Sequence, residues 1–486
     1  MILKTSPVKK VKNKYYSAIE KIMHQTEKTV KSHIDLRTKI FWGAGGLAGY
    51  IMFQTFFALA IPIYQVAMKL NPVKLGIIMA IPRFLDAITD PLMGSISDNT
   101  HSRWGRRRPY MLIGVILCGI ILPLIWMPPF KSENWILGYF LIMASLFSLT
   151  YTMFDVSYTA LGYELTTDYD ERTKVLVWRM YLGIIGMLGM PWIYKLCFMD
   201  IFGGNEIIGA RWISALLGII VIVIGIMPVI GCRENLEVQR QSKISLFKAI
   251  LYTIRNRSFV ILVIINFIIR FGISSVVFVS LYINIYYVCG SKTFAATIGG
   301  IGGTLMGLTS YISLPTMTWL SEKTDKKTTV IICLIIALFG VLTTWFSLTP
   351  KYPYMQLITG IITNFGLMGC WLLMSSMVAD ICDQDELKTG HRREGNYGAT
   401  MSFSEKVAFA ASTALTGFIL NLSGYDGSTA DTIGVPFQVI FKMKVMLIGV
   451  QGFVLVIGII LCLFYPITRK VALETRRILE ERNQNN

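Results

Sequence analysis

Long apolar blocks separated by short polar segments dominate this chain of 486 residues. A helix that spans a bilayer needs about 20 mostly apolar residues, and about twelve blocks reach that length. The pattern therefore predicts an all-α membrane protein with twelve transmembrane helices. The predicted spans are Ile40–Met68, Val73–Asn99, Tyr110–Met127, Trp135–Tyr163, Trp178–Met199, Arg211–Gly231, Ser258–Tyr287, Phe294–Leu320, Thr328–Leu348, Tyr352–Cys382, Ala399–Leu422 and Met443–Pro466.

A basic polar stretch after the sixth span divides the chain into two halves of six spans each. Two six-helix bundles around a central loop are the layout of many secondary transporters, whose substrate site lies between the halves. The predicted segments are a basic N-terminal tail at 1–39, an N-terminal bundle at 40–231, a middle loop at 232–257, a C-terminal bundle at 258–466 and a C-terminal tail at 467–486.

The composition excludes several classes of protein. Hydrophobic residues make up 53% of the chain and charged residues 15%, against about 25% charged in an average soluble domain. This balance excludes a disordered chain, a nucleic-acid-binding domain and an ordinary soluble enzyme. The eight cysteines form no CxxC pair and are expected to be buried hydrophobes, without a disulfide framework or metal site. All four histidines lie outside the predicted spans, in loops too short for a catalytic domain: His24, His33, His101 and His391.

The net charge of +17 has a simple explanation in a membrane protein, because cytoplasmic loops collect Lys and Arg. The basic loops follow spans two, four, six, eight and ten, and the positive-inside rule makes these loops cytoplasmic. Both termini are therefore expected in the cytoplasm, and the protein is expected in the inner membrane. The N-terminal tail is either solvated or, from Tyr15 to Ile34, a helix on anionic lipid.

Charged residues inside the predicted spans are the first candidates for function, because one carboxylate at the bilayer centre costs at least about 2.5–3.5 kcal/mol. In span two, Arg83, Asp86 and Asp90 share one helix face, and in span four Thr152 and Asp155 do the same. One interpretation is internal pairing with Arg83, Arg179 or Lys406. The other is a bound monovalent cation such as Na⁺, with metal ligands from Asp86, Asp90 and the Thr152 hydroxyl.

The loop after span two has a specific order of small, acidic and basic residues: Gly94, Asp98, Arg103, Gly105 and Arg106. Gly94 would permit tight helix contact, and Asp98 could pair with an arginine of the turn. The loop is interpreted either as a cytoplasmic gate latch or as a basic loop that only orients the protein.

Arg270 lies in the middle of span seven without an acidic neighbour within a helical turn. It either pairs with a remote carboxylate such as Asp155, extends into cavity water, or binds a carboxylate of the substrate. Glycines at close spacing predict close helix packing in two other spans, at Gly45 and Gly49 and at Gly299, Gly303 and Gly307.

Several separated stretches resemble the glycoside–pentoside–hexuronide:cation symporters of the major facilitator superfamily, the family of the melibiose permease. They are Arg83–Pro91 with its following loop, Tyr151–Asp155, Ala160–Glu164 with the segment ending at Arg179, Trp371–Asp380, Thr389–Gly395 and Lys406. The resemblance implies cation binding by Asp86, Asp90, Thr152 and Asp155. It implies sugar binding by Asp155, Arg179, Trp371 and Lys406.

Two positions depart from the melibiose permease pattern. Tyr50 stands where that protein holds the sugar with an aspartate, and Thr159 stands where it has a tryptophan. The identity of the sugar is therefore not carried over, and Tyr50 and Arg270 are added to the candidate sugar-binding residues.

The leading hypothesis is a symporter that couples uptake of a sugar or glycoside, with a hexuronide left open, to a gradient of Na⁺ or H⁺. The alternative is a carrier of lysolipids or other amphiphiles with the same fold. The expected partners are a small-molecule sugar, a monovalent cation and the bilayer, and a monomer without cofactor or nucleic acid is expected.

Overall fold

The computed structural model describes residues 34–100, 102–165, 169–232, 251–390, 393–426 and 434–485. The expectations for the N-terminal tail, for most of the middle loop and for all four histidines fall outside these ranges.

The first half of the chain forms the N-terminal bundle. Its elements are α2 (Leu36–Ile61) continued by the π-helical turn η1 (Pro62–Ala67), α3 (Pro72–Asn99), α4 (Arg108–Leu124), α5 (Glu133–Glu164), α6 (Tyr169–Gly189), η2 (Met190–Trp192), α7 (Ile193–Leu196), η3 (Asp200–Phe202) and α8 (Glu206–Gly231). The second half forms the C-terminal bundle. Its elements are α10 (Arg257–Ile283) continued by η4 (Asn284–Val288), α11 (Lys292–Lys323), α12 (Lys326–Ser347), α13 (Met355–Thr389), α14 (Glu394–Ser423), α15 (Phe437–Leu463) and α16 (Arg469–Asn485).

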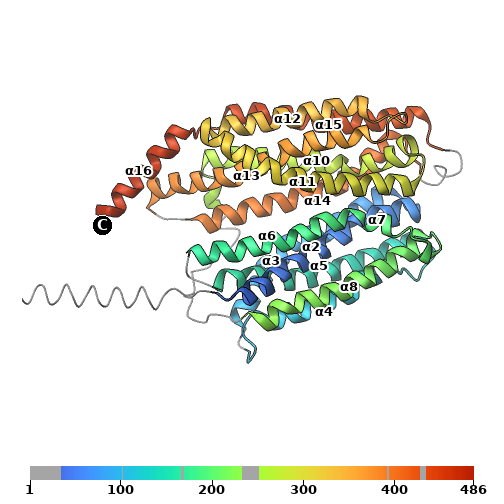
Figure 1. Ribbon diagram of the computed structural model, residues 1–486, viewed down its shortest axis with the longest axis horizontal. Helices are drawn as coiled ribbons and strands as arrows, with labels where there is room; N and C mark the ends of the chain where they lie inside the picture. The colour runs from blue at the N-terminus through green and yellow to red at the C-terminus, as the bar shows by residue number, and fades with distance from the viewer. Residues whose placement is uncertain are drawn as a thin grey trace, which may run out of the picture.

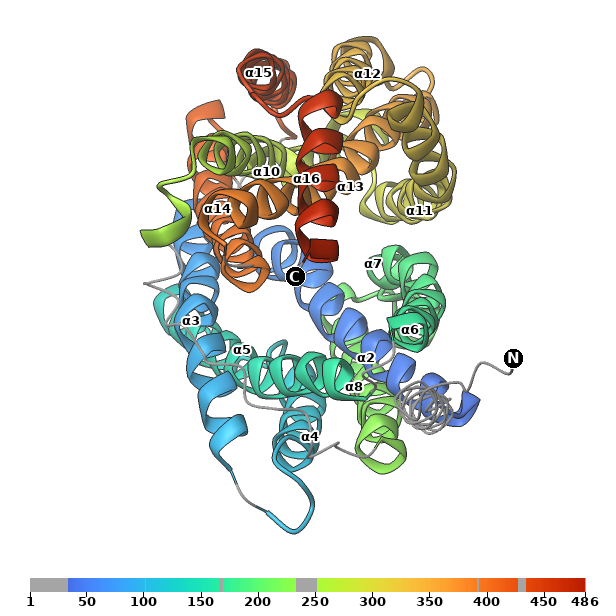
Figure 2. The ribbon, with the colours of Figure 1, turned by 90° about the vertical axis from the view of Figure 1, so that its left-hand side faces the viewer.

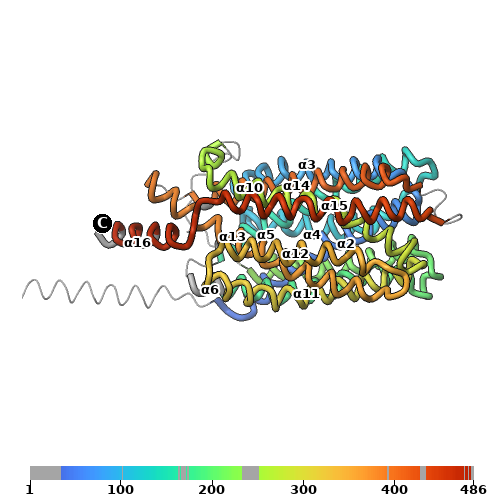
Figure 3. The backbone as a smooth tube through the Cα atoms, turned by 90° about the horizontal axis from the view of Figure 1, so that it is seen from above, coloured from blue at the N-terminus to red at the C-terminus, as the bar shows by residue number. Residues whose placement is uncertain are grey.

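The long helices run along one common axis, with the N-terminal bundle below and the C-terminal bundle above in Figure 1. Figure 3 shows the same alignment from a second direction, with α16 projecting beyond the bundle at one end. We call this end the basic end, because the turn between α3 and α4, which contains Arg103, Arg106 and Arg107, lies there. The opposite end, where η1 and α7 lie, is called the far end. The twelve predicted spans each correspond to one of these helices, with α6 and α7 together forming the fifth.

Nine helices of the described ranges are both long and apolar enough to cross a membrane. The three other spans are α4, which is shorter, and α3 and α11, which are more polar. The sixth span begins at Glu206 rather than at Arg211, because Asn205 caps the helix by accepting hydrogen bonds from the backbone N–H of Ile207 and Ile208.

Local sequence explains where the helices begin. Asn71 accepts hydrogen bonds from the N–H groups of Val73 and Lys74, and Pro72 occupies the first helical position of α3. Asn256 caps α10 in the same way, through the N–H groups of Ser258 and Phe259.

At the basic end, Glu171 joins the start of α6 to the start of α2. Its carboxylate accepts hydrogen bonds from Lys174 at 2.8 Å and pairs with Lys39 at 2.7 Å. These contacts lower the pKa of Glu171 to about 2.

Within the described ranges, the hydrophobic core that the two bundles share lies toward the far end. One core combines most of the N-terminal bundle with far-end residues of α10, α14 and α15, including Tyr282, Leu420 and Met443. A second core, which includes Phe259 and Ile381, lies within the C-terminal bundle toward the basic end.

Glycines bring the bundle backbones close together at the far end. A Cβ atom on Gly76 of α3 would lie 2.8 Å from the carbonyl oxygen of Thr413 of α14, and a Cβ on Gly417 would overlap Pro72. Gly300 and Gly303 of α11 lie in the same way against Trp192 and Pro191. The close contacts between the bundles therefore depend on glycine at these positions.

The prediction of close packing at Gly299 is wrong. A Cβ there would meet no atom within 4 Å, because the residue lies on the exposed face of α11 and its neighbour Gly300 makes the contact. Gly45 packs tightly on Tyr158, as predicted, whereas Gly49 leaves ordinary contact distances.

Candidate functional site between the bundles

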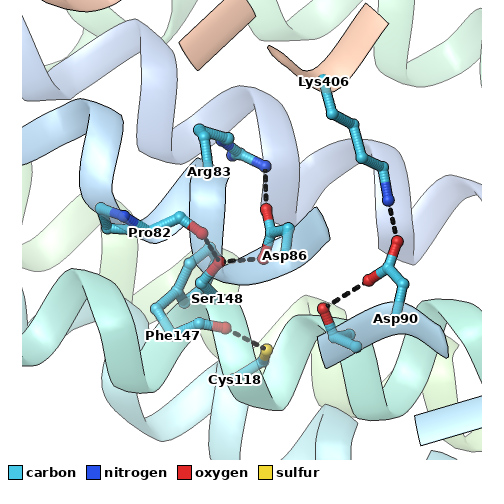
Figure 4. Close-up of polar contacts among 9 residues, drawn as sticks. Pro82, Arg83, Asp86, Asp90, Cys118, Phe147, Ser148 and Lys406 are labelled. Atoms are coloured by element: carbon cyan, nitrogen blue, oxygen red, sulfur yellow. Dashed lines mark hydrogen bonds and ion pairs between the residues drawn. The ribbon is translucent and has the colours of Figure 1, made fainter. Parts of the chain in front are cut away.

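Asp86 is enclosed within the N-terminal bundle. Its carboxylate is 2.8 Å from Arg83 Nη1 and accepts a short hydrogen bond from the Ser148 hydroxyl of α5, and the residue is 4% exposed (Figure 4). The Arg83 guanidinium also lies 4.8 Å and 4.4 Å from the ring centroids of Phe53 and Phe57. Both charges of the Arg83–Asp86 pair are thus satisfied by side chains of one bundle.

Asp90, one turn further along α3, has different surroundings. Its Oδ1 accepts a hydrogen bond of 3.0 Å from the Thr152 hydroxyl, and its Oδ2 forms an ion pair with Lys406 of α14, the partner shown in Figure 4. The Asp90 and Lys406 side chains are 25% and 35% exposed. This contact joins the two bundles, and its partial exposure leaves it accessible to water.

The set of oxygens at Asp90 suits a hard monovalent cation. A carboxylate and a hydroxyl are oxygen ligands of the kind that such ions take, and the Lys406 ammonium already holds a positive charge against the same carboxylate. Among the residues that the structure describes, His, Cys, Asp and Glu form no cluster of three or more that would indicate a transition-metal site.

Three candidate sugar-binding residues lie on the inner helices of the N-terminal bundle. The Arg179 guanidinium of α6 lies 5.8 Å and 5.3 Å from the ring centroids of Trp42 and Tyr158. Asp155 of α5 interacts electrostatically with Arg179, and its Oδ1 would lie 3.6 Å from a Cβ on Gly49. Tyr50 of α2 accepts a hydrogen bond of 3.2 Å from Gln54 through its hydroxyl and packs on Gly186 of α6.

The other candidates lie in the C-terminal bundle. Arg270 of α10 forms an ion pair of 3.0 Å with Glu405 of α14, and its guanidinium lies 5.0 Å from the ring centroid of Trp371 of α13. The interpretation that Arg270 pairs with a remote carboxylate is confirmed, but this carboxylate is Glu405 and not Asp155. The partner is the residue directly before Lys406.

The gate candidates lie at the basic end. Asp98 pairs with Arg107 at 2.9 Å, so the pairing predicted for Asp98 is present within the N-terminal bundle. Arg107 is buried, whereas Arg103 is exposed and Arg106 is half-buried. Gly105 has a positive φ of 103°, which explains a glycine in this turn. A Cβ on Gly94 would lie at an ordinary 3.8 Å from Val156, so the expected tight contact there is wrong for this conformation.

Sequence reasoning missed Ser148 and Glu405, and it did not specify Arg107 as the arginine of the turn that pairs with Asp98. Ser148 carries no charge and gives no motif signal. Glu405 could have been noticed, because an acidic residue next to an intramembrane lysine also needs a partner. Successive helical residues point about 100° apart, so Glu405 and Lys406 turn toward different helices.

Fold and site together define a class: a twelve-helix membrane transporter of the major facilitator type, with charged residues between its bundles. Residues 42–469 match the family described as MFS/sugar transport protein. The chain belongs to this family and is a multi-pass membrane transporter, not an enzyme.

Relatives and a solved structure agree with this class. An uncharacterized symporter of Bacillus subtilis is 27% identical over 455 residues, covering 93% of this chain and 96% of that protein. The isoprimeverose transporter of Lactiplantibacillus pentosus is 26% identical, covering 81% of each chain. The sodium-dependent lysophosphatidylcholine symporter 1 of Gallus gallus is 24% identical, covering 87% and 85%.

The fold is also that of a solved transporter. The crystal structure of a bacterial homologue of the human lysosomal transporter Spinster, inward-facing and unoccupied, superposes with a TM-score of 0.65 at 13% identity. It covers 93% of this chain and 98% of that chain.

Proposed function

We propose that this protein is a symporter that couples uptake of a sugar or glycoside to a gradient of a monovalent cation. The observation that carries the proposal is the contact of Asp90 with Thr152 and Lys406. It combines a cation-exchangeable carboxylate with a direct connection between the two bundles.

Exchange of cations at Asp90 provides the coupling. When Na⁺ binds to Asp90 and the Thr152 oxygen, the Lys406 ammonium loses its counter-ion and becomes available to donate hydrogen bonds to the hydroxyl groups of a sugar. Arg179, Asp155 and Trp371 supply further hydrogen bonds and an aromatic face. Since the cation prepares the sugar site, the sugar must strengthen cation binding by the same factor.

Na⁺ suits this site better than a bare proton. A proton would neutralise Asp90 without needing a second oxygen, whereas the Thr152 hydroxyl 3.0 Å from Asp90 offers a neutral hard ligand. Asp86 contributes charge nearby rather than a free oxygen, since Arg83 and Ser148 already occupy its carboxylate.

The remaining proposals concern placement in the cell. The positive-inside rule puts the basic end, with Arg107, Arg108 and Lys326, on the cytoplasmic side of an inner membrane. The Asp98–Arg107 pair and the turn around Gly105 would then serve as a cytoplasmic gate, and the chain would work as a monomer without a cofactor.

Transport assays in membrane vesicles test the proposal. Radiolabelled lactose, melibiose, cellobiose and xylobiose, together with glucose, galactose and xylose, are offered under an inward Na⁺ or H⁺ gradient. At least one sugar should accumulate above equilibrium, and an ionophore that dissipates the gradient should abolish the accumulation. Failure of every sugar to accumulate under both gradients would contradict the proposal.

A lysolipid carrier is the second candidate, favoured by the relative of Gallus gallus. The charged residues Asp155, Arg179 and Lys406 favour a polar cargo instead. Lysophosphatidylcholine should therefore leave sugar uptake unchanged in the vesicle assay, and Na⁺-driven uptake of the lysolipid itself would favour this candidate.

A further inference from the structure

A polar cluster that the sequence motifs do not describe lies in the C-terminal bundle, where α10, α13 and α14 meet. Glu405 Oε1 accepts hydrogen bonds from Asn266 Nδ2 at 3.2 Å and pairs with Arg270 Nη2 at 3.0 Å. Asn266 Oδ1 in turn accepts a hydrogen bond from Arg270 Nε at 3.3 Å. Asn266 is 2% exposed, so a buried amide fixes the positions of both charged groups.

The two charged side chains of this cluster remain accessible. The Arg270 and Glu405 side chains are 32% and 36% exposed, although both lie near the middle of helices of 27 and 30 residues. Exposure of charges to lipid at this depth is costly, so water between the bundles is the favourable surrounding for these groups. Lys406, the next residue of α14, contacts Asp90 of the opposite bundle.

The indole of Trp371 adds an aromatic face and an unused donor. Its ring lies 5.0 Å from the Arg270 guanidinium, and its Nε1 is buried without a hydrogen-bond partner in the part of the chain that the structure describes. A buried donor without an acceptor destabilises a protein, so an acceptor supplied from outside the chain would stabilise this arrangement of Trp371.

We propose that Arg270, Glu405 and Trp371 form a second substrate subsite, which binds a neutral, hydroxyl-bearing ring. The inference rests on the proposed sugar transport and defines its substrate as a neutral disaccharide or glycoside with two parts. One part lies on Asp155 and Arg179 of the N-terminal bundle, and the second lies on this cluster.

The charge of the cluster decides between neutral and acidic substrates. Arg270 and Glu405 sum to zero, and each has capacity left for a hydroxyl group as donor or acceptor. A carboxylated ring would compete with Glu405 for the guanidinium and would be repelled by it. The hexuronide that the sequence left open is therefore disfavoured at this subsite.

Equilibrium binding to the purified full-length transporter in the presence of Na⁺ tests the subsite. The probes are p-nitrophenyl β-glucoside and p-nitrophenyl β-glucuronide, and the corresponding galactoside and galacturonide, each pair differing only at C6. Wild type should bind a neutral member more tightly than its acidic match. Glu405→Gln should weaken the neutral ligand by about tenfold or more and shift the neutral-to-acidic preference toward the acid.

Two further variants keep this test decisive. The double variant Arg270→Gln/Glu405→Gln removes both charges together, so the cluster stays neutral even if the Glu405→Gln single variant does not fold. Binding of the neutral ligand to the double variant should also weaken. Asp380→Asn is the matched control, because it breaks an ion pair of 2.6 Å with Lys326 in the same bundle. It should leave the preference unchanged.

Trp371→Phe provides a separate readout. The substitution keeps an aromatic ring but removes the unused N–H, so the Tm of the unliganded protein should not fall, while binding of the neutral glycoside should weaken about threefold or more. A purely structural tryptophan would show the opposite pattern, with lower stability and unchanged binding.

The outcomes separate the two proposals. If the wild type takes up a sugar, three results would overturn the subsite alone. They are an unchanged neutral-to-acidic preference in Glu405→Gln, a wild type that prefers the acidic ligands, and binding of none of the four ligands. Absence of gradient-driven uptake of any sugar in vesicles overturns the proposed function itself.

Discussion

Asp86 and Asp90 show how two identical residues on one helix face acquire different chemistry. Their spacing of four predicts a shared face correctly, and both are paired with cations in the structure. The difference comes from the neighbouring helices. Asp86 meets Arg83 and Ser148 within one bundle, whereas Asp90 reaches across to Lys406.

This difference predicts unequal effects of the two Asp→Asn substitutions on stability. Asp86→Asn leaves the buried Arg83 guanidinium without a counter-ion, which should lower the free energy of unfolding by about 3–5 kcal/mol. Asp90→Asn affects a partly exposed pair and should cost less than about 1 kcal/mol. Unfolding of the purified variants in detergent measures both. Equal losses of stability would contradict the assignment of separate roles.

Thr152 supplies the prediction for ion selectivity. Thr152→Ala removes one neutral oxygen from the proposed cation site, so half-saturation of uptake by Na⁺ should require about two- to tenfold more Na⁺. Thr152→Ser retains the hydroxyl and should restore most of the affinity. Uptake that does not respond to Na⁺ at constant pH in the wild type would indicate proton coupling instead.

The sequence identifies charged residues more easily than it identifies their partners. Intramembrane charges such as Arg83, Asp90 and Lys406 stand out because they are costly. The partner of Arg270 lies 135 residues away along the chain in α14, and hydropathy carries no information about which helices adjoin. Ser148 and Asn266 escape notice for a related reason, since uncharged polar residues are common in spans.

At the scale of helices, α3 and α11 are the most informative elements. Both are too polar or too rich in small residues to qualify as spans by composition, yet both lie at the contact between the bundles. Their residues serve that contact rather than the lipid. The interruption of α6 by η2 follows from Pro191, which the sequence displays, and Trp192 of the same turn packs on α11.

Two glycines of α11 give a matched test of far-end packing. Gly303→Leu should overlap Pro191 and disfavour the conformation in which the bundles touch at the far end, so transport should fall at least about tenfold. A Cβ on Gly299, one turn away, would meet no atom within 4 Å, so Gly299→Leu should retain transport. Uptake rates and surface expression of both variants are measured together. Similar uptake by the two variants would contradict the proposed role of this contact.

At the scale of the whole molecule, the two bundles meet at two pairs of helices and share a hydrophobic core at the far end. Seen from the basic end in Figure 2, α3 lies beside α14, and α6 lies opposite α11. The shared core and the glycine contacts both lie toward the far end. Rocking of the bundles about the central site would exchange this packing for contacts at the basic end.

Sequence patterning predicts this architecture well at low resolution. The number of spans, the division into halves and the basic character of one end all follow from hydropathy and charge. The conformation does not follow, because it depends on contacts such as Gly76 with Thr413 and Lys292 with Glu206, which join distant parts of the chain.

The central claim is that a cation at Asp90 drives accumulation of the substrate. The most direct measurement compares wild type and Asp90→Asn in proteoliposomes, with the steady-state sugar concentration inside measured under an imposed Na⁺ gradient. The account predicts accumulation well above the outside concentration for wild type and only equilibration for Asp90→Asn, which should still exchange labelled for unlabelled sugar. Accumulation by Asp90→Asn to the wild-type level would contradict it.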